Sequence, residues 1–279
     1  MLSKLDYACF LLKTRKDIFS CPLCGKSLSL KEHSLICENG HVFDLSKKGV
    51  VRLLPRERKL QSNLYDRTLF LNRRAFIEAG FYCHLYEKIQ EILNNVESQS
   101  VLDLGCGEGT HLRFLCTQNK KQVTGVDLEP NAIQMATDYL KDGYLPVVAD
   151  VYHLPFCDCS FDAVIDILSP FVHTEVLRLL KKNGLFIKVS PAQGYLQELR
   201  ESYKLPRYEG EKEVYDNLCR HFSNIEQYRI TDIMKLSEQD YKHLIYMTPL
   251  LKHFRGKCVD PIYQITIDLN IYVIRKEKE

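Results

Sequence analysis

The 279-residue sequence predicts an α/β protein, a parallel sheet with helices on both faces, preceded by a small module of β-hairpins. Three observations support this fold class. From residue 100 onward, short apolar runs alternate with segments of helical periodicity, as they do in βαβ units. A glycine-rich stretch follows the first apolar run, where such sheets bind ligands. Near the N-terminus, three cysteines and one histidine have the spacing of a metal site.

The chain divides into three predicted parts. Residues 1–56 form an N-terminal module, in which short extended runs are broken by Cys, Gly and Asn, as in hairpins. Residues 57–97 carry apolar side chains at spacings of three and four, among them Leu85, Ile89 and Ile92, which predicts a helical connector. Residues 98–279 hold the alternating pattern and form the large domain. A chain of this length suits one large and one small domain.

Within the large domain, apolar runs of four to six residues predict buried strands, and the longer periodic segments between them predict helices. A final alternating segment predicts a strand at the C-terminus. The predicted strands are 101–104, 122–127, 144–149, 163–168, 185–189 and 263–274, and the predicted helices are 111–118, 131–140 and one that includes 177–181.

Charge is unevenly distributed along the chain. The sequence has 38 Lys and Arg against 36 Asp and Glu, a net charge of only +2. Residues 44–75 nevertheless contain nine basic and three acidic residues, so this stretch carries +6. Such a segment either contacts a polyanion such as RNA or forms a solvated surface, and charge alone leaves both alternatives open.

The cysteine content and the apolar pattern bear on where the protein acts. Eleven cysteines, an odd number, argue against a secreted disulfide framework and indicate a reducing compartment. The apolar patch at residues 7–12 is too short for a signal peptide, and no run of about 18 apolar residues predicts a membrane span. We therefore expect a cytoplasmic protein without a membrane partner.

The predicted metal site consists of Cys21, Cys24, Cys37 and His41. Two residues separate the first pair and three separate the second, which places each pair in one tight turn. Three thiolates and one imidazole are a ligand set that Zn²⁺ favours, and four protein ligands close its tetrahedron, so the zinc would be structural. The alternative is a redox Cys-x-x-Cys pair beside an unrelated cysteine and histidine, which the spacing of all four residues disfavours.

The glycine-rich stretch is Asp103-Leu-Gly-Cys-Gly-Glu-Gly109. Its Gly-x-Gly-x-Gly spacing differs from the dinucleotide motif Gly-x-Gly-x-x-Gly, and no Lys-Ser/Thr follows, so it is not a P-loop. Acids follow the next two strands: Asp127 can accept hydrogen bonds from both ribose hydroxyls, and Asp150 would lie near an adenine ring. The alternative is a Rossmann-like domain whose glycines only make tight turns. The pattern favours an adenosine ligand without pyrophosphate, contacted by Asp103, Gly105, Gly107, Glu108, Gly109, Asp127 and Asp150.

These motifs resemble those of the class I S-adenosylmethionine methyltransferases, and the chain from Cys21 onward resembles one family, the RlmA/RrmA-type 23S rRNA (guanine-N1)-methyltransferases. Segments 166–170 and 247–251 are similar to the Gram-positive branch. The resemblance rests on the metal site, Phe43-Asp44-Leu45, residues 49–55, residues 73–82, the loop 103–109, Ser169-Pro170 and Met247-Thr248-Pro249.

The resemblance implies a Rossmann-like class I methyltransferase domain, S-adenosylmethionine as cofactor and structural zinc. It also implies N1-methylguanine as product, in a hairpin loop of 23S rRNA near the peptide exit tunnel, and a homodimer. Two alternatives are a small-molecule methyltransferase whose zinc module only caps the fold, and a non-catalytic RNA-binding protein. The intact glycine loop and Asp127 argue against the second alternative.

Further site residues follow from the resemblance. It implies that Tyr82 and Tyr195 contact the cofactor, although the family usually has histidine at the position of Tyr195. The resemblance supplies no catalytic base, so this role is argued from chemistry: Asp166 is the candidate base for the guanine N1 proton and His173 a weaker one. The alternative role of Asp166 is to order the loop after its strand.

We expect His111 to be a surface residue at the junction between loop and helix. The candidates for phosphate contacts are basic residues of the segment that carries the excess positive charge: Lys47, Lys48, Arg52, Arg73 and Arg74.

Overall fold

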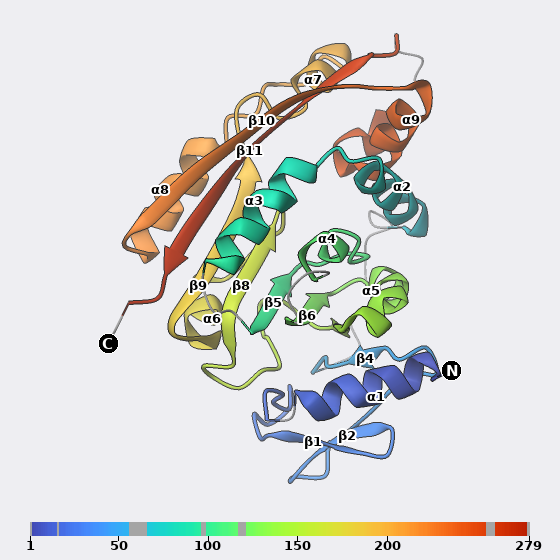
Figure 1. The fold of residues 1–279 in the computed structure, drawn as a ribbon, viewed down its shortest axis with the longest axis vertical. Coiled ribbons are helices and arrows are strands. Elements are labelled where there is room, and N and C mark those ends of the chain that lie inside the picture. The colour runs from blue at the N-terminus through green and yellow to red at the C-terminus, as the bar shows by residue number, and fades with distance from the viewer. Residues whose placement is uncertain are drawn as a thin grey trace.

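The computed structural model (Figure 1) describes residues 2–15, 17–55, 66–95, 99–116, 121–254 and 260–277. In this part of the chain, an eight-stranded sheet occupies the centre and a three-stranded sheet lies close to the N-terminus. The predicted part boundaries at 56–57 and 97–98, together with the basic residues Arg56, Arg58 and Lys59, lie outside the described residues. The division into three parts therefore stays a prediction.

The N-terminal module begins with α1 (Lys4–Thr14), which the sequence pattern did not predict. The side chain of Ser3 accepts a hydrogen bond from the first turn of α1 and caps the helix. The predicted hairpins follow as an antiparallel sheet of β1 (Leu28–Lys31), β2 (Ser34–Cys37) and β3 (Val42–Asp44). The hairpin prediction for this segment is confirmed.

The central sheet has the strand order β10-β11-β9-β8-β5-β6-β7-β4. The six strands from β4 to β9 run parallel, as the alternating pattern predicted, whereas β11 is antiparallel to both of its neighbours. The chain leaves β10 and enters β11 at the same end, and a connection at one end makes two neighbouring strands antiparallel. The strands are β4 (Val51–Arg52), β5 (Ser100–Leu104), β6 (Gln122–Asp127), β7 (Tyr144–Val148), β8 (Phe161–Ile167), β9 (Leu180–Pro191), β10 (Ile225–Lys235) and β11 (Gln264–Arg275).

Helices cover both faces of this sheet, as predicted. One core contains apolar side chains of α2, α3, α4, α5 and α9, and another contains those of α1, α6 and α8. Within the described residues, every helix is too short or too polar to span a lipid bilayer. The helices after α1 are α2 (Arg67–Glu78), α3 (Cys83–Asn94), α4 (Leu112–Cys116), α5 (Pro130–Ala136), α6 (His173–Leu179), α7 (Gln197–Ser202), α8 (Glu211–His221) and α9 (Glu238–Met247), with 3₁₀ turns η1 (Thr137–Asp142) and η2 (Pro249–Phe254).

The N-terminal module packs directly on the large domain. Strand β4 extends the central sheet beyond β7, and the next residue continues the contact, since Leu53 N–H donates to the carbonyl of Val148 at 2.9 Å. The buried guanidinium of Arg15, just after α1, donates to the carbonyl of Gly143 at 2.6 Å. Apolar side chains of the module and of the sheet form one buried cluster. Both parts therefore share a hydrophobic core.

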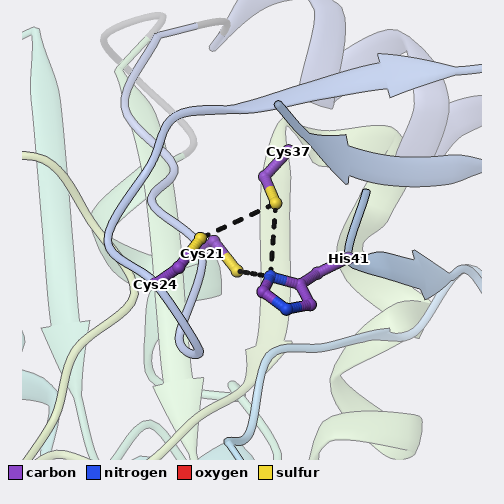
Figure 2. A group of neighbouring side chains, drawn as sticks. All are labelled: Cys21, Cys24, Cys37 and His41. Atoms are coloured by element: carbon purple, nitrogen blue, oxygen red, sulfur yellow. Dashed lines mark hydrogen bonds between the residues drawn. The ribbon is translucent and has the colours of Figure 1, made fainter. Parts of the chain in front are cut away.

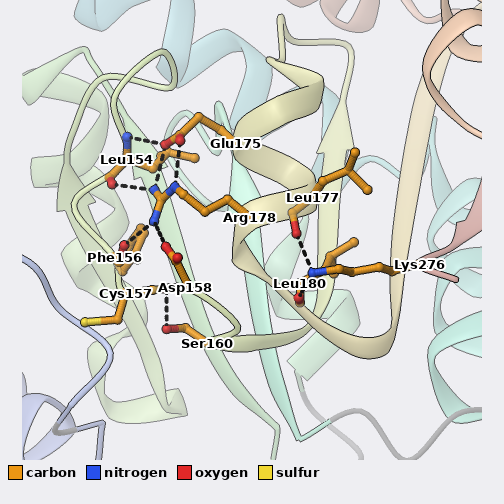
Figure 3. Close-up of polar contacts among 10 residues, drawn as sticks. All are labelled: Leu154, Phe156, Cys157, Asp158, Ser160, Glu175, Leu177, Arg178, Leu180 and Lys276. Atoms are coloured by element: carbon orange, nitrogen blue, oxygen red, sulfur yellow. Dashed lines mark hydrogen bonds and ion pairs between the residues drawn. The ribbon is translucent and has the colours of Figure 1, made fainter. Parts of the chain in front are cut away.

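The loop between β7 and β8 is the second contact between module and domain. Phe19 of the module stacks obliquely on Phe156 of this loop, with ring centroids 5.3 Å apart. Figure 3 shows how Arg178 of α6 holds the loop from the other side. Its guanidinium donates to the carbonyls of Leu154 and Phe156 at 3.1 and 2.7 Å and pairs with Glu175 at 2.7 Å. Because buried carbonyls need donors, Arg178 keeps the loop in the shape that receives the module.

Candidate metal centre and cofactor site

The four predicted metal ligands converge in the N-terminal module (Figure 2). The Nδ1 atom of His41 lies 3.5 Å from Cys21 Sγ and 3.4 Å from Cys37 Sγ, and Cys24 Sγ lies 3.7 Å from Cys37 Sγ. A zinc ion bound tetrahedrally at about 2.3 Å from sulfur separates two thiolates by about 3.8 Å. The spacing of these atoms and their S₃N donor set therefore fit Zn²⁺.

Two tight turns position these ligands. The first lies before β1, where Gly25 N–H donates to the carbonyl of Cys21 at 2.8 Å. The second lies between β2 and β3, where Gly40 N–H donates to the carbonyl of Cys37 at 2.9 Å. Gly25 and Gly40 have φ values of +72° and +80°, a left-handed conformation that glycine adopts without strain. Four protein ligands leave no open position for substrate, so the metal is structural.

The glycine loop leaves β5 at the carboxyl edge of the sheet, as predicted. Gly105, Gly107 and Gly109 all have positive φ values, between +57° and +75°. A β-carbon at Gly105 would lie 2.5 Å from Ser169 Oγ, so a larger residue has no space there. Ser169 belongs to the loop after β8, and its hydroxyl donates to the carbonyl of Leu104 at 2.7 Å. The glycine loop and the loop after β8 are therefore packed against each other.

Two buried acids of this loop keep oxygen atoms without donors. Asp103 and Glu108 are each 1% exposed. Among the described residues, neither Asp103 Oδ1 nor Glu108 Oε1 has a hydrogen-bond partner. A buried carboxylate oxygen without a donor is costly unless a ligand supplies one. The ammonium group and ribose hydroxyls of S-adenosylmethionine are donors of the required kind, so the residues present fit this cofactor.

The remaining predicted acids lie at the ends of the next two strands. Asp127 closes β6 and accepts hydrogen bonds from Gly107 N at 2.9 Å and Glu129 N at 2.8 Å. Burial raises the pKa of Asp127, although these two hydrogen bonds act to lower it. Asp150 is buried just beyond β7 and accepts from Tyr152 N at 3.1 Å. The structure therefore brings Asp127 to the glycine loop and places Asp150 beside it on the same edge.

The two tyrosines predicted to contact the cofactor meet each other. Tyr82 precedes α3 and Tyr195 follows β9, and their hydroxyl oxygens are 2.8 Å apart. Tyr82 is buried and Tyr195 is partly buried, and burial is the main reason that the pKa of each is raised. A neutral tyrosine pair at this place can stack and exchange hydrogen bonds but carries no charge.

Asp166 is completely buried in β8, where Lys188 of β9 pairs with its carboxylate. Ser169 Oγ donates to the other carboxylate oxygen at 3.0 Å, and Lys188 Nζ also donates to the carbonyl of Ser169 at 2.6 Å. These contacts favour the loop-ordering alternative, and a catalytic role for Asp166 stays a prediction. His173, the weaker candidate, begins α6 and stacks on His221 with ring centroids 3.6 Å apart.

The structure corrects the expectation for His111. This side chain is only 8% exposed, and its Nε2 lies 2.8 Å from Asp103 Oδ2. Its ring also stacks on Tyr86 of α3. His111 is buried because the turn before α4 directs its side chain back over β5, where it contacts Asp103. Local spacing does not indicate this contact or those of Lys188, although a carboxylate in a buried strand is itself a signal that a basic partner must exist.

The candidate phosphate contacts fall into two groups. Lys47, Lys48 and Arg52 are exposed on the N-terminal module. Arg73 and Arg74 lie on α2 in the large domain. Arg74 pairs with Asp138 at 3.1 Å and donates to the carbonyl of Met135, so it connects α2 to α5 and η1. Arg73 lies against the glycine loop, where a β-carbon on Gly107 would be 3.4 Å from its Nη1.

Replacing one zinc ligand is expected to destabilise the whole described core. Cys37→Ser removes a thiolate and should lower the zinc content to well below one equivalent. Because the module shares a core with the central sheet, the free energy of unfolding should fall by about 3 kcal/mol or more. Metal analysis and denaturant unfolding measure both effects. Cys159→Ser, at an exposed position, is the matched control and should change neither, whereas full zinc occupancy in Cys37→Ser would contradict the assignment.

The pair of His111 and Asp103 predicts a pH-dependent contribution to stability. Burial lowers the pKa of His111, but the charge of Asp103, its hydrogen bond and the charge of Glu108 together raise it above its ordinary value. Protonation therefore stabilises the folded state below the unfolded pKa of about 6.5, and this contribution is lost as pH rises through the folded pKa.

His111→Gln keeps a neutral donor and should cost about 1 kcal/mol at pH 6 but much less at pH 9. Urea unfolding at both pH values measures the difference between the two proteins. An equal cost at both pH values would show that the charge on His111 makes no contribution.

Comparison with known proteins agrees with this geometry. A methyltransferase-domain family model matches residues 101–184, and a model described as "RlmA, N-terminal", a zinc ribbon, matches residues 19–62. A Haemonchus contortus phosphoethanolamine N-methyltransferase, solved with S-adenosylhomocysteine, has a similar fold with a TM-score of 0.51 at 15% identity, covering 78% of this chain and 60% of that one.

Two curated relatives span most of the chain. The first is the Bacillus subtilis protein named "Putative 23S rRNA (guanine-N(1)-)-methyltransferase YxjB", 36% identical over 84% of this chain and 86% of its own. The second is the 23S rRNA (guanine(748)-N(1))-methyltransferase of Streptomyces fradiae, 29% identical over 84% and 85%. Zinc ribbon, methyltransferase domain and similarity over 84% of the chain agree, and the chain therefore belongs to the Gram-positive branch of the RlmA-type 23S rRNA (guanine-N1)-methyltransferase family.

Proposed function

We propose that this protein transfers a methyl group from S-adenosylmethionine to N1 of a guanine in a hairpin loop of 23S rRNA, near the peptide exit tunnel. The observation that carries the proposal is the shared core of the zinc module and the methyltransferase sheet. It holds the exposed basic residues of the module in a fixed relation to the cofactor site. The names of the two curated relatives support the same substrate, and we propose that the enzyme acts in the cytoplasm.

Bound S-adenosylmethionine would supply a methyl group activated by its sulfonium. The residues proposed to hold it are the glycine loop with Asp103 and Glu108, then Asp127 toward the ribose and Asp150 toward the adenine. Tyr82 and Tyr195 would enclose the methionine end, where an aromatic face attracts the sulfonium cation. The task of these residues is to fix one geometry, since aligned reactants remove much of the barrier to transfer.

Guanine N1 must lose a proton during the reaction, and the loop after β8 is the proposed wall of the guanine site. Asp166 lies behind this loop, with its carboxylate occupied by Lys188 and Ser169. We infer that Asp166 positions the loop and keep its role as general base as the alternative. If Asp166 positions the loop, Asp166→Asn should lower kcat equally at all pH values. If Asp166 is the general base, the same substitution should remove the acidic limb of the pH profile.

The function is tested by mapping methylated nucleotides in 23S rRNA. Cells that lack this protein should lose one N1-methylguanine from a hairpin loop, and the purified protein with S-adenosylmethionine should restore it on the isolated rRNA. Mass spectrometry of nuclease fragments gives the position. An unchanged set of methylguanines would contradict the proposal, and methylation of small metabolites in its place would favour the small-molecule alternative. Failure to bind S-adenosylmethionine would favour a non-catalytic RNA-binding protein.

The exposed basic residues of the module are the proposed phosphate contacts. The triple variant with Lys47, Lys48 and Arg52 changed to Ala should bind a 23S rRNA hairpin at least 10-fold more weakly at low salt. The slope of log affinity against log salt should fall by roughly 2 to 3, because each phosphate contact contributes about 0.7 to 0.9. Lys212→Ala with Lys242→Ala, also exposed, is the control. An unchanged slope in the triple variant would contradict these contacts.

We further propose a homodimer, with β10 as the candidate interface. In the described part of the chain, β10 is the end strand of the sheet, and its outer edge has no neighbour. The side chain of Ile233, which lies in β10, is 67% exposed. Long strand edges are usually covered or protected in native proteins. Light scattering over a range of concentrations tests this proposal, and a monomer mass throughout would contradict it.

A further inference from the structure

Arg73 and Arg74 are neighbours on α2 with different surroundings. Arg74 has three partners: it pairs with Asp138, donates to the carbonyl of Met135 and lies over the ring of Tyr139. Arg73 lies over the ring of Phe70, 5.5 Å from its centroid. Among the described residues, its guanidinium has no hydrogen bond and no ion pair. A half-buried guanidinium with five unused donors is a binding site for an anion.

The position of Arg73 identifies which anion it faces. Its Nη1 is the atom nearest to the position of a β-carbon on Gly107, at 3.4 Å, so it lies directly against the glycine loop. Its charge also reaches the tyrosine pair: burial raises the pKa of Tyr82 and Tyr195, and Arg73 acts to lower both. Arg73 therefore lies half-buried beside the glycine loop, close to the proposed methionine end of the cofactor site.

Groups that can bind both charges of a zwitterionic amino acid lie at the same place. The glycine loop supplies the buried carboxylate oxygens of Asp103 and Glu108 that have no donor. Arg73 supplies donors that have no acceptor. The methionine part of S-adenosylmethionine is a zwitterion with an ammonium and a carboxylate on one carbon atom, and it satisfies both groups at once.

We propose that Arg73 binds the methionine carboxylate of S-adenosylmethionine, while the acids of the glycine loop receive its ammonium group. The inference rests on the cofactor of the proposed function and is independent of the RNA substrate. It replaces the expectation from sequence that Arg73 contacts a phosphate. Arg74, about 100° further round the helix, contacts Asp138 and Met135 instead and has no part in this cofactor contact.

Calorimetric titration of the full-length protein tests the proposal with two ligands. S-adenosylmethionine has the carboxylate, and decarboxylated S-adenosylmethionine lacks only this group. The unmodified protein should bind the decarboxylated ligand 10- to 100-fold more weakly than S-adenosylmethionine. Arg73→Met should bind S-adenosylmethionine 10- to 100-fold more weakly than the unmodified protein and should bind the two ligands equally, within about twofold. Arg73→Lys keeps the charge but not the planar fork, and should fall between these results.

Controls separate this role from others. Arg74→Met is the matched variant: it should lower the melting temperature yet still prefer S-adenosylmethionine over the decarboxylated ligand by the full factor. Arg73→Met should keep its affinity for an rRNA hairpin. An equal loss for both ligands in Arg73→Met, or a loss of RNA affinity with unchanged affinity for S-adenosylmethionine, would overturn the proposal. If the unmodified protein bound neither ligand, the proposed function itself would fail, which is a different result.

Discussion

Ser169 lies so close to Gly105 that a β-carbon could not be accommodated between them. This contact joins the two loops that bound the site, one from β5 and one from β8. It is held from behind by the buried pair of Lys188 and Asp166, which also binds both the hydroxyl and the carbonyl group of Ser169. A buried ion pair is tolerated when its remaining donors and acceptors are satisfied, and here they are satisfied by the loop that must be ordered. The stability of the fold and the geometry of the proposed cofactor site therefore both depend on Asp166, Lys188 and Ser169.

The zinc module depends on the same edge of the sheet. The strand β7 ends at Val148, and the loop that follows contains Asp150 and carries Phe156 into contact with Phe19 of the module. Arg178 supplies donors to the carbonyls of this loop. The loop that contains Asp150, an acid proposed to bind the cofactor, therefore also receives the zinc module. A structural metal in such a module has an effect beyond its own hairpins, since loosening the module would remove packing from the loop after β7.

Much of the fold could be predicted because its signals are local. The buried strands β5 to β8 are short apolar runs separated by helical segments, and each was expected at nearly its observed position. Strand β10 was not expected, because Asp232 lies on its half-buried face and Ile233 on its exposed face, which breaks the polar and apolar alternation of a strand with one solvated face. The antiparallel direction of β11 and the addition of β4 beside β7 also escaped prediction, since both depend on which strand is the neighbour.

The sequence by itself determined the metal ligands, the glycine loop and the acids that end consecutive strands. Their chemistry is set by residue type and short spacing, and a parallel sheet brings the strand ends to one edge whatever the details. Only the tertiary structure decided the partners: His111 for Asp103, Lys188 for Asp166, and different environments for Arg73 and Arg74. These pairings join residues from different elements, and adjacent positions on a helix face different directions. A contact across the fold has no signal in local spacing, because it depends on how the helices pack on the sheet.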